Sequence, residues 1–169
     1  MNAIVAVTDD WGIGRDGALL VRNREDMRHF VRQTMGGTVI MGRKTLQSFP
    51  GGRPLKGRRN IVLTGDPTQI MCEAPEGGSI EVATGIDDVL RLVEGDDPQT
   101  VWVIGGESVY RQLLDRCERV VVTKNHVTVP ADAFFPNLNE LDGWKIVEKS
   151  GNALTDEGVP FEFIVYEAR

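Results

Sequence analysis

The chain has 169 residues, 41% of them apolar, which is enough for one domain with a sizeable core. Its 25 acidic and 19 basic residues give a net charge of −6, which argues against a nucleic-acid partner. No apolar run approaches the roughly 18 residues of a membrane span, and residues 3–7 are too short a run for a signal sequence, so we expect a cytoplasmic protein with no membrane partner.

The hydrophobic pattern predicts strands and helices that alternate along most of the chain. The clearest helical spacing falls at residues 24–35, where Met27, Phe30, Val31 and Met35 share one face. The predicted strands are 3–7, 38–41, 60–64, 80–84, 101–104, one beginning at 119–123, 145–148 and 161–166, and the predicted helices are 24–35, 44–49, 86–93 and 108–114.

This alternation predicts parallel pairing with right-handed crossovers. The last two strands have no helix between them, so we expect them to be antiparallel. The predicted fold is therefore α/β: a single domain with a mixed, mostly parallel sheet of about eight strands, flanked by about four helices, with an antiparallel C-terminal strand. Ligands bind beyond the carboxyl ends of strands in such sheets, which is where Gly42-Arg43, Thr64-Gly65, Gly105-Gly106 and Thr123 fall.

Residues 12–17 match the dinucleotide-binding pattern G-x-G-x-x-G after a predicted strand. That site needs a tight turn leading directly into a helix. Here residues 8–11 intervene after the strand, and the next helical pattern begins only near Arg24. We therefore interpret the three glycines as a flexible loop over an active site.

Asp26 is the main candidate for an active-site acid. Acids in the first turn of a helix are commonly there because of the helix dipole, a role that Glu25 can also fill. Asp26, however, lies at the edge of the apolar stripe, four residues before Phe30. An acid there can point into an apolar cleft, where desolvation raises its pKa.

Basic and glycine residues near the strand ends indicate a small anionic ligand. The segment Gly42-Arg43-Lys44-Thr45 joins a strand end to a helix start, a place that suits either a phosphate or an ordinary surface cap. A second basic group, which is alternatively a solvated loop, comprises Arg53, Lys56, Arg58 and Arg59. No metal-ligand or redox spacing involves Cys72, Cys117, His29 or His126, so we expect no metal site and structural histidines.

Taken together and in this order, the motifs resemble the dihydrofolate reductase family, in its bacterial chromosomal form, almost from end to end. The resemblance rests on Ala6, Ile13-Gly14, Asp26, Phe30, residues 39–45, 52–55, 57–58, 60–64 and 103–106, Val109-Tyr110 and Thr123. It implies an NADPH-dependent enzyme that reduces 7,8-dihydrofolate to 5,6,7,8-tetrahydrofolate, by hydride transfer to C6 and protonation at N5. It further implies a role in one-carbon metabolism, binding of antifolate inhibitors, a monomer, and an adenosine-binding lobe at about residues 37–88 within the single domain 1–169.

The resemblance also implies roles for individual residues. Asp26, backed by Thr123, would accept hydrogen bonds from the pterin 2-amino group and N3, and Arg58 would bind the α-carboxylate of the glutamate tail. Arg43 and Lys44 would meet the cofactor phosphates, and Gly105-Gly106 would form a cis peptide bond beside the nicotinamide. The implied substrate-binding residues are Ile4, Val5, Met27, Phe30, Phe49, Leu55, Arg58 and Ile104. The implied cofactor-binding residues are Ala6, Ile13, Gly14, Gly17, Leu19, Gly42, Arg43, Lys44, Thr45, Leu63, Thr64, Gly105, Gly106, Glu107, Ser108, Val109 and Tyr110, with residues 13–19 as a mobile loop.

The sequence departs from the family pattern at two places. Leu20-Val21 stand where the family commonly has Pro-Trp, whose tryptophan holds an ordered water near the pterin. Gly65 stands where many members have a serine, threonine or arginine that contacts the adenosine phosphate, so NADPH preference here relies on Arg43 and Lys44. Two alternatives stay open: a pyrimidine reductase of riboflavin synthesis with the same fold, and a non-catalytic nucleotide-binding protein.

Overall fold

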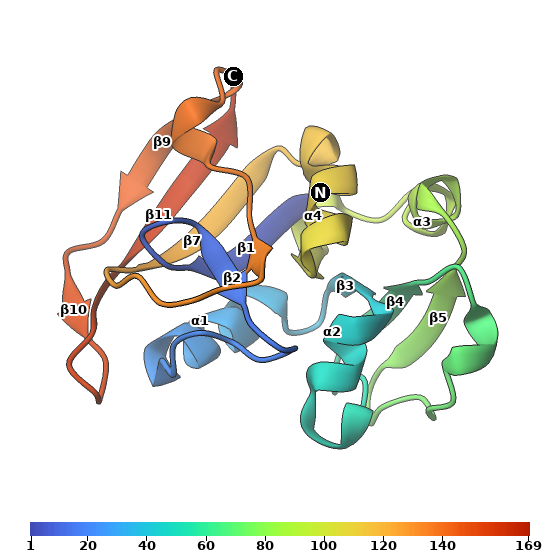
Figure 1. Cartoon of the computed structure of the whole chain (residues 1–169). Coiled ribbons are helices and arrows are strands. Elements are labelled where there is room, and N and C mark those ends of the chain that lie inside the picture. The colour runs from blue at the N-terminus through green and yellow to red at the C-terminus, as the bar shows by residue number, and fades with distance from the viewer.

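The structure, a computed structural model, describes all 169 residues (Figure 1). Its helices are α1 (Arg24–Thr34), α2 (Arg43–Ser48), α3 (Ile86–Leu92) and α4 (Glu107–Leu113). Its strands are β1 (Asn2–Val7), β2 (Gly12–Gly14), β3 (Thr38–Gly42), β4 (Arg59–Leu63), β5 (Ser79–Ala83), β6 (Val101–Gly105), β7 (Arg119–Asn125), β8 (Ala133–Phe134), β9 (Trp144–Lys149), β10 (Ala153–Leu154) and β11 (Pro160–Ala168). Short 3₁₀ turns include η2 (Pro67–Gln69) and η5 (Leu138–Glu140).

The main sheet has nine strands in the order β10-β11-β7-β1-β6-β3-β4-β5, with β9 also paired to β11. The strands from β7 to β5 in that order are parallel to their neighbours, whereas β11 is antiparallel to β7, β9 and β10. The chain passes from β9 to β11 without a helix, and such short connections join antiparallel strands. The predicted mixed, mostly parallel sheet with an antiparallel C-terminal strand and four helices is confirmed.

Helices cover both faces of the sheet, so the fold has three layers (Figure 1). One core contains Val89 of α3 and Leu113 of α4, and the other contains Leu46 of α2 with Phe30 of α1 packed against it. Side chains along β1 alternate between them, because Val5 belongs to the first core and Ile4 to the second. Strands buried on both faces read as continuous apolar runs, which is why the sequence pattern predicts them.

Three short strands are absent from the sequence prediction. β2 and β8 form a separate antiparallel pair, and β10 has two residues. Segments this short carry no readable periodicity. After β2 the chain makes a bridge between Arg15 and Ala18, and no helix begins before Arg24. This geometry confirms that residues 12–17 are not a dinucleotide-binding turn. None of the helices combines the length and apolarity needed to cross a bilayer.

Candidate active site

Asp26 lies in the first turn of α1 and faces β7, at the edge of a cavity of about 550 Å³. Its Oδ1 accepts a hydrogen bond from the hydroxyl of Thr123 on β7, with an oxygen–oxygen distance of 2.6 Å. Burial raises the pKa of Asp26, and the bond from Thr123 opposes part of that rise. The expected raised pKa is therefore confirmed, and Oδ2 forms no hydrogen bond within the protein.

No basic side chain neutralises Asp26. The arginines nearest to it in sequence form ion pairs elsewhere, Arg24 with Asp156 and Arg28 with Glu25. Tyr110, whose hydroxyl donates to the carbonyl of Ile4 at 2.7 Å, has its pKa raised by burial and then by the charge of Asp26. A carboxylate in these surroundings suits a ligand that brings its own hydrogen-bond donors.

Asn23 is a site residue that the sequence reasoning missed. It precedes α1, and its side-chain oxygen accepts from the backbone N–H of Asp26 at 3.1 Å. Its amide nitrogen donates to the side-chain oxygen of Asn125 on β7 at 3.2 Å. An asparagine just before an amphipathic helix is a recognisable N-cap signal, but nothing in the sequence indicates the bond to Asn125.

Arg58 is buried, with 7% of its surface exposed, and it has no acidic partner. Its Nε donates to the carbonyl of Lys56 at 2.8 Å, and one terminal nitrogen donates to the hydroxyl of Thr34 in the last turn of α1 at 3.2 Å. Burial lowers the pKa of this guanidinium. A buried cation without a counter-ion is unfavourable unless an anion joins it, so Arg58 is well suited to a ligand carboxylate.

The other predicted basic residues near Arg58 do not form one free patch. Arg59 pairs with Glu81 and Asp96, and Lys56 pairs with Glu76. Arg58 and Arg59 both border a polar cavity of about 460 Å³ at the amino ends of β3, β4 and β5, where no hydrophobic side chain contributes. Arg53 is exposed and forms no ion pair, so Arg58 is the one member of this group that is buried without an acidic partner.

Most of the predicted apolar substrate residues gather on the face of the sheet that carries α1. Ile4, Phe30, Phe49, Leu55 and Ile104 belong to or pack against one cluster. Met27 borders the same cavity as Asp26 and is 49% exposed. Val5 lies in the opposite core, so only its backbone faces this side.

Predicted cofactor residues meet where β3 enters α2 and β6 enters α4. A methyl group added at Gly105 or Gly106 would lie 3.3 Å from the hydroxyl oxygen of Thr45, and one at Gly42 would lie 3.2 Å from Val109. The Gly105-Gly106 peptide bond is cis, as the family resemblance implies. Because these glycines have no side chains, a flat or phosphorylated ligand can come close to the backbone at the carboxyl edge of the sheet.

We call the region around Gly42, Gly105 and Gly106 the glycine junction, and the predicted cofactor residues near it differ in burial and in their partners. Arg43 donates to the side chain of Gln69, whereas Lys44 is exposed. Gly65 is exposed with open space where a side chain would stand. Val109 and Tyr110 are buried in the core, Leu63 packs against it, Thr64 is buried, Glu107 pairs with Arg111, Ser108 is exposed, and Ala6 is partly buried.

The loop at residues 13–19 is anchored at one point and exposed beyond it. The Asp132 carboxylate accepts from the backbone N–H of Asp16 at 2.8 Å, and the backbone N–H of Asp132 donates to the carbonyl of Gly14 at 3.0 Å. Ile13 packs against the core, but Leu19 is 63% exposed and borders the cavity beside Asp26. Gly17 has a φ of +78°, and nothing lies within 4 Å of the position that a Cβ would occupy.

Sequence spacing found no acid partner for either histidine, but the fold provides two for His126. Its Nδ1 lies 3.2 Å from Asp9 and its Nε2 lies 3.3 Å from Glu162, residues far away in sequence. His29 stacks on Phe163 with ring centroids 4.2 Å apart, and burial lowers its pKa. No cluster of three or more metal-ligand residues forms.

The site combines a partly buried carboxylate at the edge of a cavity with closely packed glycines at the carboxyl edge of an α/β sheet. The family model "Dihydrofolate reductase" matches residues 1–168. Dihydrofolate reductase of Bacillus subtilis is 36% identical over 93% of this chain and 88% of its own, and that of Heliothis virescens is 33% identical over 99% and 96%. A solved dihydrofolate reductase from Enterococcus faecalis, complexed with NADP(H) and RAB-propyl, has a TM-score of 0.82 and 27% identity over 99% of this chain and 95% of that one. The chain belongs to the dihydrofolate reductase family.

Proposed function

We propose that this protein reduces 7,8-dihydrofolate to 5,6,7,8-tetrahydrofolate with NADPH and so supplies tetrahydrofolate for one-carbon metabolism. The observation that carries the proposal is the Asp26 carboxylate, held by Thr123 at 2.6 Å at the edge of a cavity, with its pKa raised by burial. Support also comes from the family and from the Enterococcus faecalis relative, whose structure contains NADP(H).

Each site residue has a proposed task. Asp26 accepts hydrogen bonds from the pterin 2-amino group and N3, and Thr123 orients the carboxylate for that contact. Arg58 binds the α-carboxylate of the glutamate tail, because it is buried without another anion. The apolar cluster around Ile4 and Phe30 excludes water from the pterin face.

The residues at the glycine junction suit NADPH. The backbone at Gly42, Gly105 and Gly106 admits close approach, and Arg43 and Lys44 supply positive charge for the phosphates. NADPH, when bound, supplies the hydride. The protein contributes orientation and, through Asp26, an ionisable group beside the pterin, whose raised pKa favours proton retention.

Neither alternative is favoured. A pyrimidine reductase acts on a ribosyl phosphate, which would leave Asp26 and Arg58 without matching ligand groups. A non-catalytic nucleotide-binding protein has no need of Asp26 or of its bond to Thr123. The relatives described above are named dihydrofolate reductases.

The test is the rate of NADPH oxidation with dihydrofolate, measured beside a ribityl-pyrimidine precursor. We expect oxidation with dihydrofolate alone, and inhibition by methotrexate, whose protonated diaminopteridine pairs with the Asp26 carboxylate. Folded protein that binds NADPH but neither dihydrofolate nor methotrexate would contradict the proposal.

We further propose a cytoplasmic monomer in which residues 37–88 form an adenosine-binding lobe. These features are proposed from the family resemblance and from the glycine junction between β3 and α2. Sedimentation velocity tests the monomer, cell fractionation tests the compartment, and amide exchange with and without adenosine phosphates tests the lobe.

A further inference from the structure

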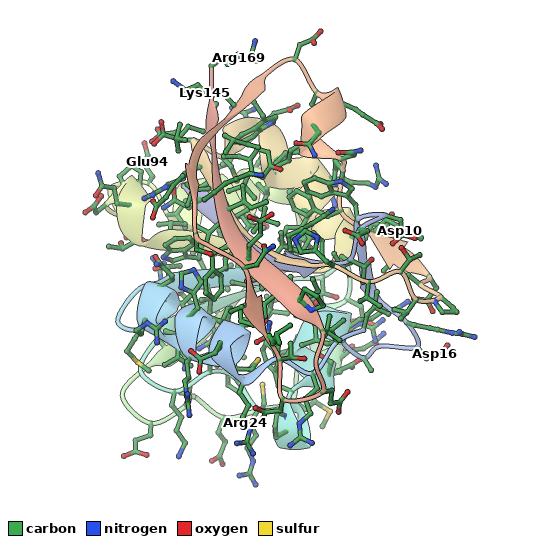
Figure 2. All side chains as sticks on the ribbon, turned by 90° about the vertical axis from the view of Figure 1, so that its left-hand side faces the viewer. Asp10, Asp16, Arg24, Glu94, Lys145 and Arg169 are labelled. Atoms are coloured by element: carbon green, nitrogen blue, oxygen red, sulfur yellow. The ribbon has the colours of Figure 1, made fainter.

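The first turn of α1 is attached to β7 at two places. Thr123 and Asn125 are two residues apart on β7, so their side chains project from the same face of the sheet. Thr123 holds the carboxylate of Asp26, and Asn125 holds the amide of Asn23. Figure 2 shows the side of the molecule that β11 crosses, with α1 beside the strand and Arg24, which follows Asn23, near its lower end.

Asn23 makes two hydrogen bonds with opposite ends of one amide group. Its oxygen accepts from the backbone N–H of Asp26 at 3.1 Å, and its nitrogen donates to Asn125 at 3.2 Å. Asn23 and Asn125 are both buried, with 5% and 2% of their surfaces exposed. Burying an amide group costs free energy unless its hydrogen bonds are made. The two buried amides are therefore held in the geometry in which they bond to each other.

Capping of the helix does not by itself require this arrangement. Serine, threonine or aspartate also caps a helix well, and none of them provides an amide donor. The bond to Asn125 therefore does something other than cap α1: it connects the backbone of Asp26 to the strand that also orients the Asp26 carboxylate.

The position of Asn23 in the chain adds a second reason. It lies between the loop that carries the exposed Leu19 and the helix that carries Asp26. The bond to Asn125 fixes the start of the helix to β7 at this point. Misplacement of a reacting group by about 1 Å can lower a rate by roughly 10²-fold, so such a fixed point has catalytic value.

We propose that the Asn23–Asn125 hydrogen bond is a positioning element that holds the Asp26 carboxylate against Thr123. The proposal deepens the proposed function and rests on it. Asn23 and Asn125 act through Asp26 and are positioning residues.

The test uses Asn23→Ser and Asn125→Ala, singly and together, in the full chain. Serine keeps the N-cap but is too short to reach Asn125, so α1 stays capped. The matched control is Asn137→Ser, the same change at the N-cap of η5, a turn that contributes none of the proposed site residues. Single-turnover hydride transfer is measured across pH, with NADPH affinity and thermal melting beside it.

We expect each single variant to lower the rate of hydride transfer roughly tenfold, with NADPH affinity unchanged. The pH midpoint moves upward, because the bond from Thr123 lowers the pKa of Asp26 and is weakened in the variants. The double variant matches the singles, because both changes remove one bond. The Asn137→Ser control behaves as the parent protein.

Parental rates and pH midpoints in folded Asn23→Ser protein would overturn the proposal, as would multiplicative losses in the double variant. NMR titration of the Asp26 carboxyl carbon in ligand-free parent and Asn23→Ser proteins separates this failure from failure of the proposed function. An upward shift supports the positioning role even for a parent that does not turn over dihydrofolate. An identical titration in the two proteins refutes it, and this holds whether or not Asn125→Ala folds.

Discussion

Replacement of Asp26 by asparagine distinguishes an active-site acid from a helix-dipole acid. Asparagine keeps the size of the side chain and one oxygen that accepts from Thr123, so packing should survive. Its amide NH₂, however, can only donate and so cannot accept the hydrogen bonds that the pterin 2-amino group and N3 offer. Asparagine also has no charge to stabilise a protonated pterin. General acid–base assistance is typically worth about 10²–10⁴ in rate, which corresponds to roughly 2.7–5.4 kcal/mol of barrier.

The effect on stability has the opposite sign. The folded protein holds the Asp26 proton more tightly than the unfolded chain does, because burial raises the pKa. Stability from this residue is therefore present at low pH and is lost as pH rises through the folded pKa. Asparagine needs no ionisation, so at neutral pH the variant should melt at or above the parental temperature.

Stopped-flow hydride transfer across pH, beside a thermal melt, provides the assay. We expect a large fall in rate at neutral pH and partial recovery at lower pH, where dihydrofolate arrives already protonated at N5. A helix-dipole acid predicts instead near-normal turnover and a stability loss of about 0.3–1 kcal/mol. Parental rates with a lowered melting temperature would refute the catalytic assignment of Asp26.

Three further changes have distinct outcomes. Arg58→Leu should raise KM for dihydrofolate at least roughly hundredfold, since two charge-assisted bonds to the carboxylate contribute about 1.5–3 kcal/mol each. Dihydropteroate, which lacks the glutamate, is the control substrate, and an equal effect on both substrates would argue against the carboxylate contact. Arg43→Ala with Lys44→Ala should reduce the preference for NADPH over NADH, measured as the ratio of kcat/KM, with dihydrofolate KM largely kept; equal use of both cofactors by the parent would count against this role. Thr123→Val removes the bond that lowers the pKa of Asp26, so the pH midpoint of hydride transfer should move to higher pH, and an unchanged midpoint would show that the bond has no influence on ionisation.

The sheet was predictable because its strands are short apolar runs buried on both faces, as in residues 38–41. The raised pKa of Asp26 was also predictable, because its place at the edge of the stripe on α1 implies burial. Contacts between distant segments were not predictable. The bond from Asn23 to Asn125 spans 102 positions, and the acids beside His126 come from a loop and from β11. Periodicity describes one element at a time and contains no information about which elements become neighbours.

The ion-pair partners of the basic residues were likewise not predictable from the sequence. Arg58 and Arg59 are adjacent and identical in type, yet one is buried without an acid and the other pairs with Glu81 and Asp96. Both residues border the same polar cavity, and only the fold shows that the acids lie beside Arg59.

Reduction of dihydrofolate by this protein is measured in a single turnover with NADPH and 7,8-dihydrofolate, in which the product is identified by chromatography. We expect one 5,6,7,8-tetrahydrofolate to form for each NADPH consumed. Binding of both ligands without loss of NADPH, or loss of NADPH without tetrahydrofolate, would contradict it.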